Sequence, residues 1–112
     1  MNKVNRLKDG NQIQSVLKQK NKLFNNICNI YYVKVNDGLP YKIAIIVSKK
    51  ISKKAVIRNK VKRQIRAIIN ELNLSMLNIH IVIIAKIDWL NTDYNNCKKT
   101  LFKLFQKIGG AK

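Results

Sequence analysis

The sequence predicts an α+β fold, a sandwich of helices against a small sheet. Two apolar runs of strand length, residues 41–48 and 79–85, are rich in isoleucine and valine, as expected for covered strands. Between them, residues 52–73 repeat their apolar positions with the 3.6-residue period of a helix. A chain of 112 residues is long enough for one hydrophobic core, so residues 1–112 are expected to form a single domain.

Local patterns predict the elements of the first half. Ile13, Val16 and Leu17 have the i, i+3, i+4 spacing of one helix face, and Asp9 is an acceptable N-cap. Residues 11–20 are therefore expected to form a short helix. Residues 27–35 are rich in β-branched and aromatic side chains and end at the turn sequence Asn-Asp-Gly of residues 36–38. This pattern predicts a strand, which should form a hairpin with the strand at residues 41–48.

The second half should contain two helices and one strand. The long helix at residues 52–73 presents a narrow apolar stripe, formed by Ile57, Val61, Ile65, Ile68 and Leu72. The strand at residues 79–85 is expected at the centre of the sheet, because it is apolar on both faces. A last helix, with Asn91 or Thr92 as its N-cap, should follow from the apolar positions that precede two glycines, namely Leu101, Phe102, Leu104, Phe105 and Ile108.

The charge of the chain indicates a polyanionic partner. Lysine and arginine total 23 against five acidic residues, which gives a formal net charge of +18 and an isoelectric point near 10.3. Such a field attracts nucleic acid. No apolar run approaches the roughly 18 residues of a membrane span, and no signal-peptide pattern follows the N-terminus. We therefore expect a soluble, cytoplasmic protein with no membrane partner and no small-molecule substrate.

The positive charge is concentrated around the long helix. Ten lysines and arginines and no acidic residue lie between residues 38 and 70. Arg58, Lys62 and Arg66 form one i, i+4, i+8 row, with Asn59 and Arg63 beside it, and Lys60 extends the patch. Like charges at this spacing destabilise an isolated helix by a few tenths of a kcal/mol per pair. A phosphate backbone would offset that repulsion, so the patch favours RNA binding.

Two other interpretations of the basic patch are weaker. A solvated helix face usually mixes charges of both signs to gain salt bridges, whereas this face has one sign. A membrane-surface or calmodulin-binding helix would need the apolar stripe that the domain core already requires.

The order of several motifs resembles the bacterial ribonuclease P protein family. The segment Val-Ser-Lys-Lys at residues 47–50 is followed by Ala-Val-Ile-Arg-Asn-Lys-Val-Lys-Arg-Gln-Ile-Arg at residues 55–66. Arg-Leu-Lys at residues 6–8, the isoleucine-rich strand that ends Ile-Ala-Lys at residues 84–86, and the late helix with Leu101, Leu104 and Phe105 fall in the family's order. The resemblance covers almost the full length of the chain.

The resemblance implies a fold and a function. The fold would be a two-layer α-β sandwich, ribosomal protein S5 domain 2-like, with a small mixed sheet and a left-handed βαβ crossover against the usual rule. The function would be that of the protein subunit of ribonuclease P, the endoribonuclease that removes the 5′ leader of precursor tRNA and generates the mature tRNA 5′ end. The partners would be the catalytic RNA and precursor tRNA, with Mg²⁺ and catalysis supplied mainly by the RNA subunit.

The resemblance also assigns two RNA-contacting surfaces. The first would face the catalytic RNA and comprises Lys49, Lys50, Lys53, Lys54, Arg58, Asn59, Lys60, Lys62, Arg63 and Arg66. The second is a cleft for the 5′ leader between the first helix and the sheet. Its helix positions would be Ile13 and Leu17, where relatives often have phenylalanine, with Tyr31 or Tyr32 as the aromatic platform. The alternative, that the apolar residues of the first helix only form core, is about equally compatible with the pattern.

No residue has an evident role in hydrolysis. His80 lies inside an apolar strand, and neither Cys28 nor Cys97 has a metal-binding or disulfide spacing, so we expect no catalytic residue and no protein-bound metal. Two rival functions stay open from the residues alone: a non-enzymatic RNA-binding module such as a ribosomal or assembly protein, and an autonomous basic nuclease. The second would cleave RNA without any added RNA subunit.

Overall fold

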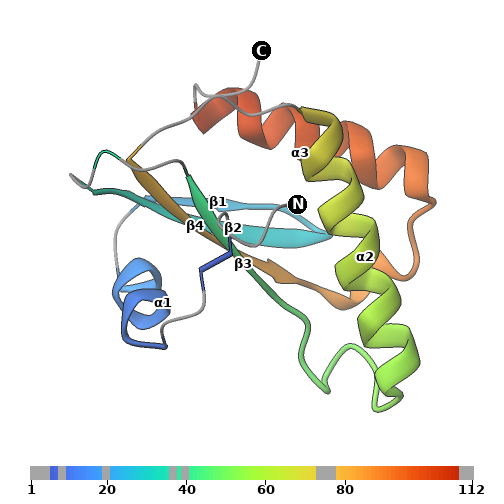
Figure 1. Ribbon diagram of the computed structural model, residues 1–112. Helices are drawn as coiled ribbons and strands as arrows, with labels where there is room; N and C mark the ends of the chain where they lie inside the picture. Colours follow the sequence, from blue (N-terminus) through green and yellow to red (C-terminus); the bar gives the residue numbers. More distant parts are fainter. Residues whose placement is uncertain are drawn as a thin grey trace.

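The computed structural model describes residues 6–7, 10–18, 21–35, 38, 41–72 and 78–108. Figure 1 labels the helices and strands in these ranges. In chain order they are α1 (Gly10–Leu17), β1 (Lys22–Phe24), β2 (Cys28–Lys34), β3 (Lys42–Ile46), α2 (Ala55–Leu72), β4 (Ile79–Ala85), the short 3-10 helix η2 (Ile87–Trp89) and α3 (Tyr94–Ile108). The predicted helices and strands are all present, and β1 and η2 are additions.

The four strands form one mixed sheet in the order β1-β2-β4-β3. β4 lies in its interior, as predicted. It pairs antiparallel with β2, where Ile30 is opposite Ile83, and parallel with β3, where Ala44 is opposite Val82. The parallel pair is connected through α2, which gives the βαβ unit that the resemblance implied. The predicted mixed α+β fold is therefore confirmed.

The predicted hairpin between β2 and β3 is wrong. These two strands are consecutive in the chain, but β4 lies between them in the sheet. The physical reason is that β4 has an apolar side chain at nearly every position, and six of its seven residues are buried. A strand with apolar side chains on both faces is most stable in the interior of a sheet, where it has a neighbouring strand on each edge.

The ends of several elements differ from the sequence prediction. α1 ends at Leu17, three residues early. The N-cap of α3 is Asp93 rather than Asn91 or Thr92: its carboxylate accepts a hydrogen bond from the backbone N–H of Asn96 at 3.4 Å, and its carbonyl accepts one from Cys97 at 3.0 Å. The Thr92 hydroxyl instead donates to the carbonyl of Asp88. The predicted cap Asp9, most of the turn at 36–38, and the stop at Gly109 and Gly110 lie outside the described residues.

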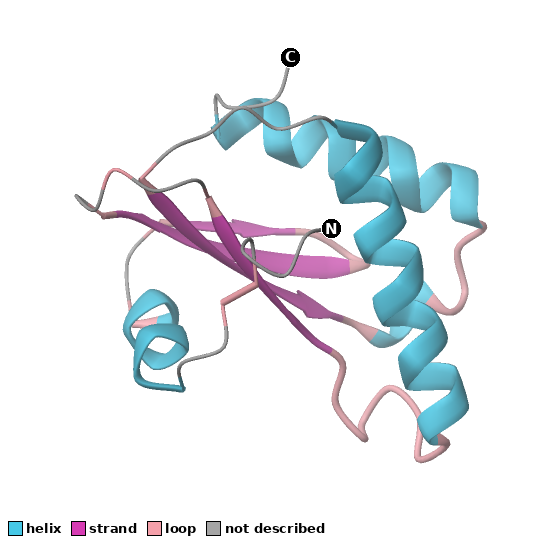
Figure 2. Cartoon of the chain, viewed as in Figure 1, coloured by secondary structure: helices cyan, strands magenta, loops and turns pink. Residues whose placement is uncertain are grey.

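Helices cover both faces of the sheet. In Figures 1 and 2, α2 and α3 lie against one face and α1 against the other. The α2/α3 face holds the larger core, which includes Ile65, Ile81 and Phe105, whereas Val16 and Val82 belong to a smaller core under α1. The helix α1 thus adds a partial third layer to the expected two-layer sandwich. Among the described residues, no helix is long and apolar enough to cross a membrane.

Candidate RNA interface

The loop before α2 presents four lysines to solvent. Val47 and Ile51 anchor this loop because both are buried in the core. The Ser48 and Ser52 hydroxyls accept hydrogen bonds from the backbone N–H groups two residues on, which stabilises local turns. The predicted RNA-binding residues of this loop are all exposed, namely Lys49, Lys50, Lys53 and Lys54.

The predicted basic residues of α2 divide into exposed and half-buried groups. Asn59, Lys60 and Arg63 are exposed, whereas Arg58, Lys62 and Arg66 are half-buried. Arg58 is also part of the fold, since its Nη1 donates to the carbonyls of Ser52 at 2.9 Å and Lys53 at 3.0 Å. Arg58 therefore ties the lysine loop to the first turn of the helix.

Arg66 lies at the edge of the sheet near the first helix. It lines a cavity of about 250 Å³ beside β3, together with Arg6, Leu7 and Ile13. The segment of Arg6 runs alongside β3, where the backbone N–H of Leu7 donates to the Ile43 carbonyl at 2.9 Å. The Nε atoms of Arg6 and Arg66 are both buried and make no hydrogen bond within the described part of the chain. An anion in this cavity would supply the missing acceptors.

The α1 face of the sheet holds one of the two candidate tyrosines. Tyr31 is half-buried there, near Ile13 and Leu17, whereas Tyr32 packs against the core on the α2/α3 face. Consecutive residues of a strand point to opposite faces, so only one tyrosine can join the cleft. Placing Tyr32 in the cleft is therefore wrong. Val16 is fully buried core, while Ile13 and Leu17 stay partly accessible.

Sequence reasoning missed an aromatic neighbour of Tyr31. Phe24 is 63% exposed, and its ring meets that of Tyr31 edge to face with centroids 6.0 Å apart. The Lys22 ammonium lies 5.9 Å from the Tyr31 ring centroid, within cation–π range. The strand β1 that brings both residues here has only three residues in a polar segment, which is too short for an alternating pattern to be recognised.

Of the described carboxylates, Glu71 and Asp93 are engaged and Asp88 is exposed, and both cysteines are buried. Glu71 forms an ion pair with Lys98 across α2 and α3, and Asp93 caps α3. Burial raises the pKa of the Cys28 thiol to about 12 and that of Cys97 to about 11, so neither is a thiolate at neutral pH. In the described ranges, no three His, Cys, Asp or Glu side chains come together as a metal site would require.

Comparison with known proteins shows which family the chain belongs to. The family model described as Ribonuclease P matches residues 1–109. The chain belongs to the ribonuclease P protein family. Ribonuclease P protein components of Mycoplasma mycoides and Bacillus cereus are 36% and 31% identical to it, covering 91% and 97% of this chain and 94% and 95% of the relative.

Solved ribonuclease P proteins share the fold. The Staphylococcus aureus protein superposes with a TM-score of 0.84 at 24% identity, covering 98% of this chain and all of the other. The Thermotoga maritima protein gives 0.77 at 24% identity over 91% of this chain and 96% of its own. Membership of the family gives the chain a role in ribonuclease P, the tRNA-processing ribonuclease, and an RNA partner within that complex.

Proposed function

We propose that this chain is the subunit that binds the catalytic RNA of ribonuclease P and the 5′ leader of precursor tRNA, and so promotes endonucleolytic removal of the leader in the cytoplasm. The observation behind this proposal is that a cationic surface meets the α1 face of the sheet at one place, where Arg66 of α2 lines a cavity with Ile13 of α1. The lysine loop and α2 as far as Asn70 contain no acidic residue, and the α1 face of the sheet holds the Tyr31 ring with the exposed Phe24 beside it. Within this family, the first suits structured RNA and the second suits a single strand.

The contact with the catalytic RNA would be mainly electrostatic. The exposed lysines of residues 49–54 and the exposed Lys60 and Arg63 can each approach a phosphate. Arg58 would act from the base of the same surface, where it fixes the loop conformation. Lys60 supplies a positive charge to this contact but not the bidentate hydrogen bonding that an arginine would give to a phosphate.

The leader would lie on the α1 face of the sheet. Phe24 and Tyr31 offer rings for base stacking, Ile13 and Leu17 offer apolar contact, and Lys22 adds a cation. The cavity between Arg6 and Arg66 lies beside Ile13, so it could hold a phosphate at one end of this cleft. The leader cleft of this chain thus relies on aromatic residues of the strands rather than of the first helix.

Catalysis and Mg²⁺ binding would belong to the RNA. Among the described residues, the carboxylates of Glu71 and Asp93 are engaged in a salt bridge and a helix cap, and Asp88 does not come together with two further His, Cys, Asp or Glu side chains. The reaction would be hydrolysis of the phosphodiester between leader and tRNA. The protein would lower the repulsion between two RNA molecules and hold the leader in place.

Binding of the assembled enzyme to tRNA with and without a leader tests this function. We expect the protein to strengthen binding of a precursor tRNA to the catalytic RNA and to have little effect on mature tRNA, because only the precursor reaches the cleft. Equal strengthening of both would contradict a leader contact. No association of the chain with the catalytic RNA would contradict the proposal as a whole and favour a different RNA-binding role.

A further inference from the structure

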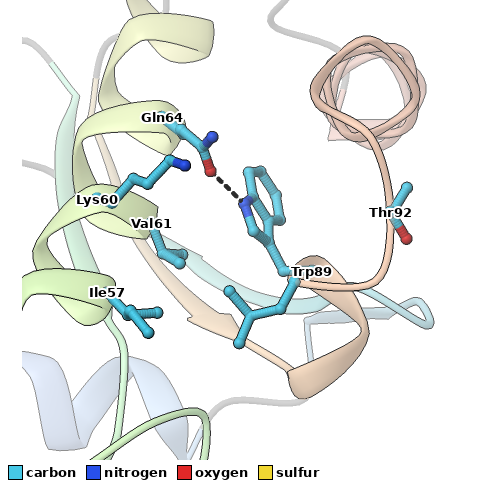
Figure 3. A pocket seen from close by; sticks show the side chains of 7 residues that line it. Ile57, Lys60, Val61, Gln64, Trp89 and Thr92 are labelled. Carbon is cyan, nitrogen blue, oxygen red and sulfur yellow. Dashed lines mark hydrogen bonds between the residues drawn. The ribbon is translucent and has the colours of Figure 1, made fainter. Parts of the chain in front are cut away.

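A groove between α2 and the segment that joins β4 to α3 shares Lys60 and Arg63 with the cationic surface described above, and its other lining residues belong to neither of the two surfaces. It consists of two adjoining cavities of about 450 and 330 Å³, which share Lys60 and Gln64 in their walls. Trp89 and Leu90 form the opposite wall of the larger cavity, and Tyr94 that of the smaller one. Figure 3 shows the larger cavity, with α2 on one side and Trp89 on the other.

Gln64 has a fixed orientation in this groove. The indole N–H of Trp89, which is 2% exposed, donates to Gln64 Oε1 at 2.9 Å. The reverse orientation of the amide would place two donors against each other, so Oε1 must face the indole. The amide nitrogen points away from the ring in Figure 3. The groove therefore contains a preorganised donor that can serve a ligand.

The walls combine apolar surface with positive charge. Ile57 and Val61 line the larger cavity from α2, and Leu90 is 43% exposed at its mouth. Lys60 and Arg63 stand at the rim, and among the described residues that line either cavity none is acidic. A volume of about 450 Å³ is within the range of pockets that take small organic groups. The complementary ligand has a flat or apolar body, a hydrogen-bond acceptor and a nearby negative charge.

We propose that this groove binds one unpaired nucleotide of the ribonuclease P RNA. Its base would enter the cavity between Ile57 and Leu90 and accept a hydrogen bond from Gln64 Nε2, and its phosphate would lie at Lys60 and Arg63. The nucleotide must be unpaired because bases within an A-form helix are inaccessible to side chains in this way. This inference rests on the proposed function, because the groove opens beside the cations assigned to the catalytic RNA.

Trp89 is the only tryptophan of the chain, so its fluorescence reports on the groove directly. The experiment titrates the full-length protein with a short single-stranded oligouridylate and with an abasic RNA of equal length. We expect a saturable change in tryptophan emission with oligouridylate and an affinity about fivefold or more above that of the abasic RNA, because base contacts add to phosphate contacts. Equal affinities, or binding without any change in emission, would overturn the proposal.

Two uncharged substitutions test whether the preference for oligouridylate over abasic RNA arises in the groove. Gln64→Met removes the donor while keeping a side chain of similar length, and Leu90→Ala removes part of the apolar wall. Each should weaken the binding of oligouridylate about three- to tenfold and leave that of abasic RNA unchanged. The matched control is Lys103→Ala, an exposed residue of α3 outside the groove, which should keep the preference for bases.

The outcomes separate this inference from the proposed function. If Gln64→Met and Leu90→Ala bind both RNAs as the wild type does, the groove is not a nucleotide site, although the catalytic RNA can still bind through the lysine loop. If the wild-type chain does not bind the catalytic RNA, the proposed function fails and this inference fails with it.

Discussion

At the scale of single residues, position on the strand decides which aromatic side chain can meet RNA. Tyr31 and Tyr32 are adjacent in the chain, yet one lies on the α1 face and the other packs into the larger core. Their order in the sequence could not settle this, because a shift of one residue exchanges the faces of a strand. The register of β2 against β4 pairs Tyr31 with Val82, which belongs to the core under α1, and so places Tyr31 on the α1 face.

Phe24 provides the sharpest residue-level test of the leader cleft. Its ring is 63% exposed, so Phe24→Ala should change the free energy of unfolding by less than about 0.5 kcal/mol. It should weaken the binding of leader-containing precursor tRNA by about 1–3 kcal/mol through lost stacking. Equilibrium binding of the assembled enzyme measures this, and Tyr31→Phe, which keeps the ring, serves as the conservative control. If Phe24→Ala binds precursor tRNA as tightly as the wild type does, the Phe24 ring does not contact the leader.

The buried cysteines predict a loss of stability at high pH. Burial raises the pKa of Cys28 from 9.0 to about 12 and that of Cys97 to about 11. Because the unfolded chain releases these protons first, their contribution to stability is complete below pH 9 and is lost as the pH rises through the folded-state values. The free energy of unfolding, measured in urea, should therefore fall between pH 9 and 11. The fall should be shallower in Cys28→Ala than in the wild type, and identical slopes would contradict the assignment.

At the scale of elements, α2 serves both the core and the proposed RNA surface. Its stripe of Val61, Ile65, Ile68, Ile69 and Leu72 is buried, and its exposed side is basic. The 3.6-residue period predicts both faces from sequence. Arg66 lines one cavity with Arg6, whereas Lys60 and Arg63 line another with Tyr94. This separation could not be predicted from the sequence, because Arg6 and Tyr94 come from distant segments of the chain.

The core face of α2 can be tested through Ile65. Its side chain is fully buried, so Ile65→Ala should destabilise the protein by about 2–5 kcal/mol through lost burial and a cavity. Val56→Ala, on the same helix and 76% exposed, is the matched control and should change stability by less than about 0.5 kcal/mol. Urea unfolding compares the two, and similar midpoints for both variants would refute the packing of α2.

The basic face of α2 can be tested through the salt dependence of RNA binding. Each neutralised phosphate contributes about 0.7–0.9 to the slope of log affinity against log salt concentration. Arg63→Ala should therefore flatten the slope for the catalytic RNA by about one unit. Lys103→Ala, an exposed residue of α3, should leave the slope in place. A slope unchanged by Arg63→Ala would argue against contact between Arg63 and RNA.

At the scale of the whole molecule, the fold class followed from sequence and the strand order did not. Period, charge and motif order predicted the three helices, the three long strands and the interior position of β4. The hairpin prediction failed because adjacency in the chain is a local signal, whereas the burial of β4 on both faces is a property of the assembled sheet. For the same reason, the sequence did not predict the strand β1, the contact of Phe24 with Tyr31 or the hydrogen bond between Trp89 and Gln64. Each of these depends on contacts between remote segments.

Cleavage of a precursor tRNA at low Mg²⁺ tests the central claim most directly. The assay compares the catalytic RNA alone, the protein alone and the two together. The account predicts cleavage at the 5′ end of the mature tRNA only in the mixture, and its loss when Arg58, Arg63 and Arg66 are replaced together by alanine. Failure of the protein to stimulate the RNA, or cleavage by the protein alone, would contradict it.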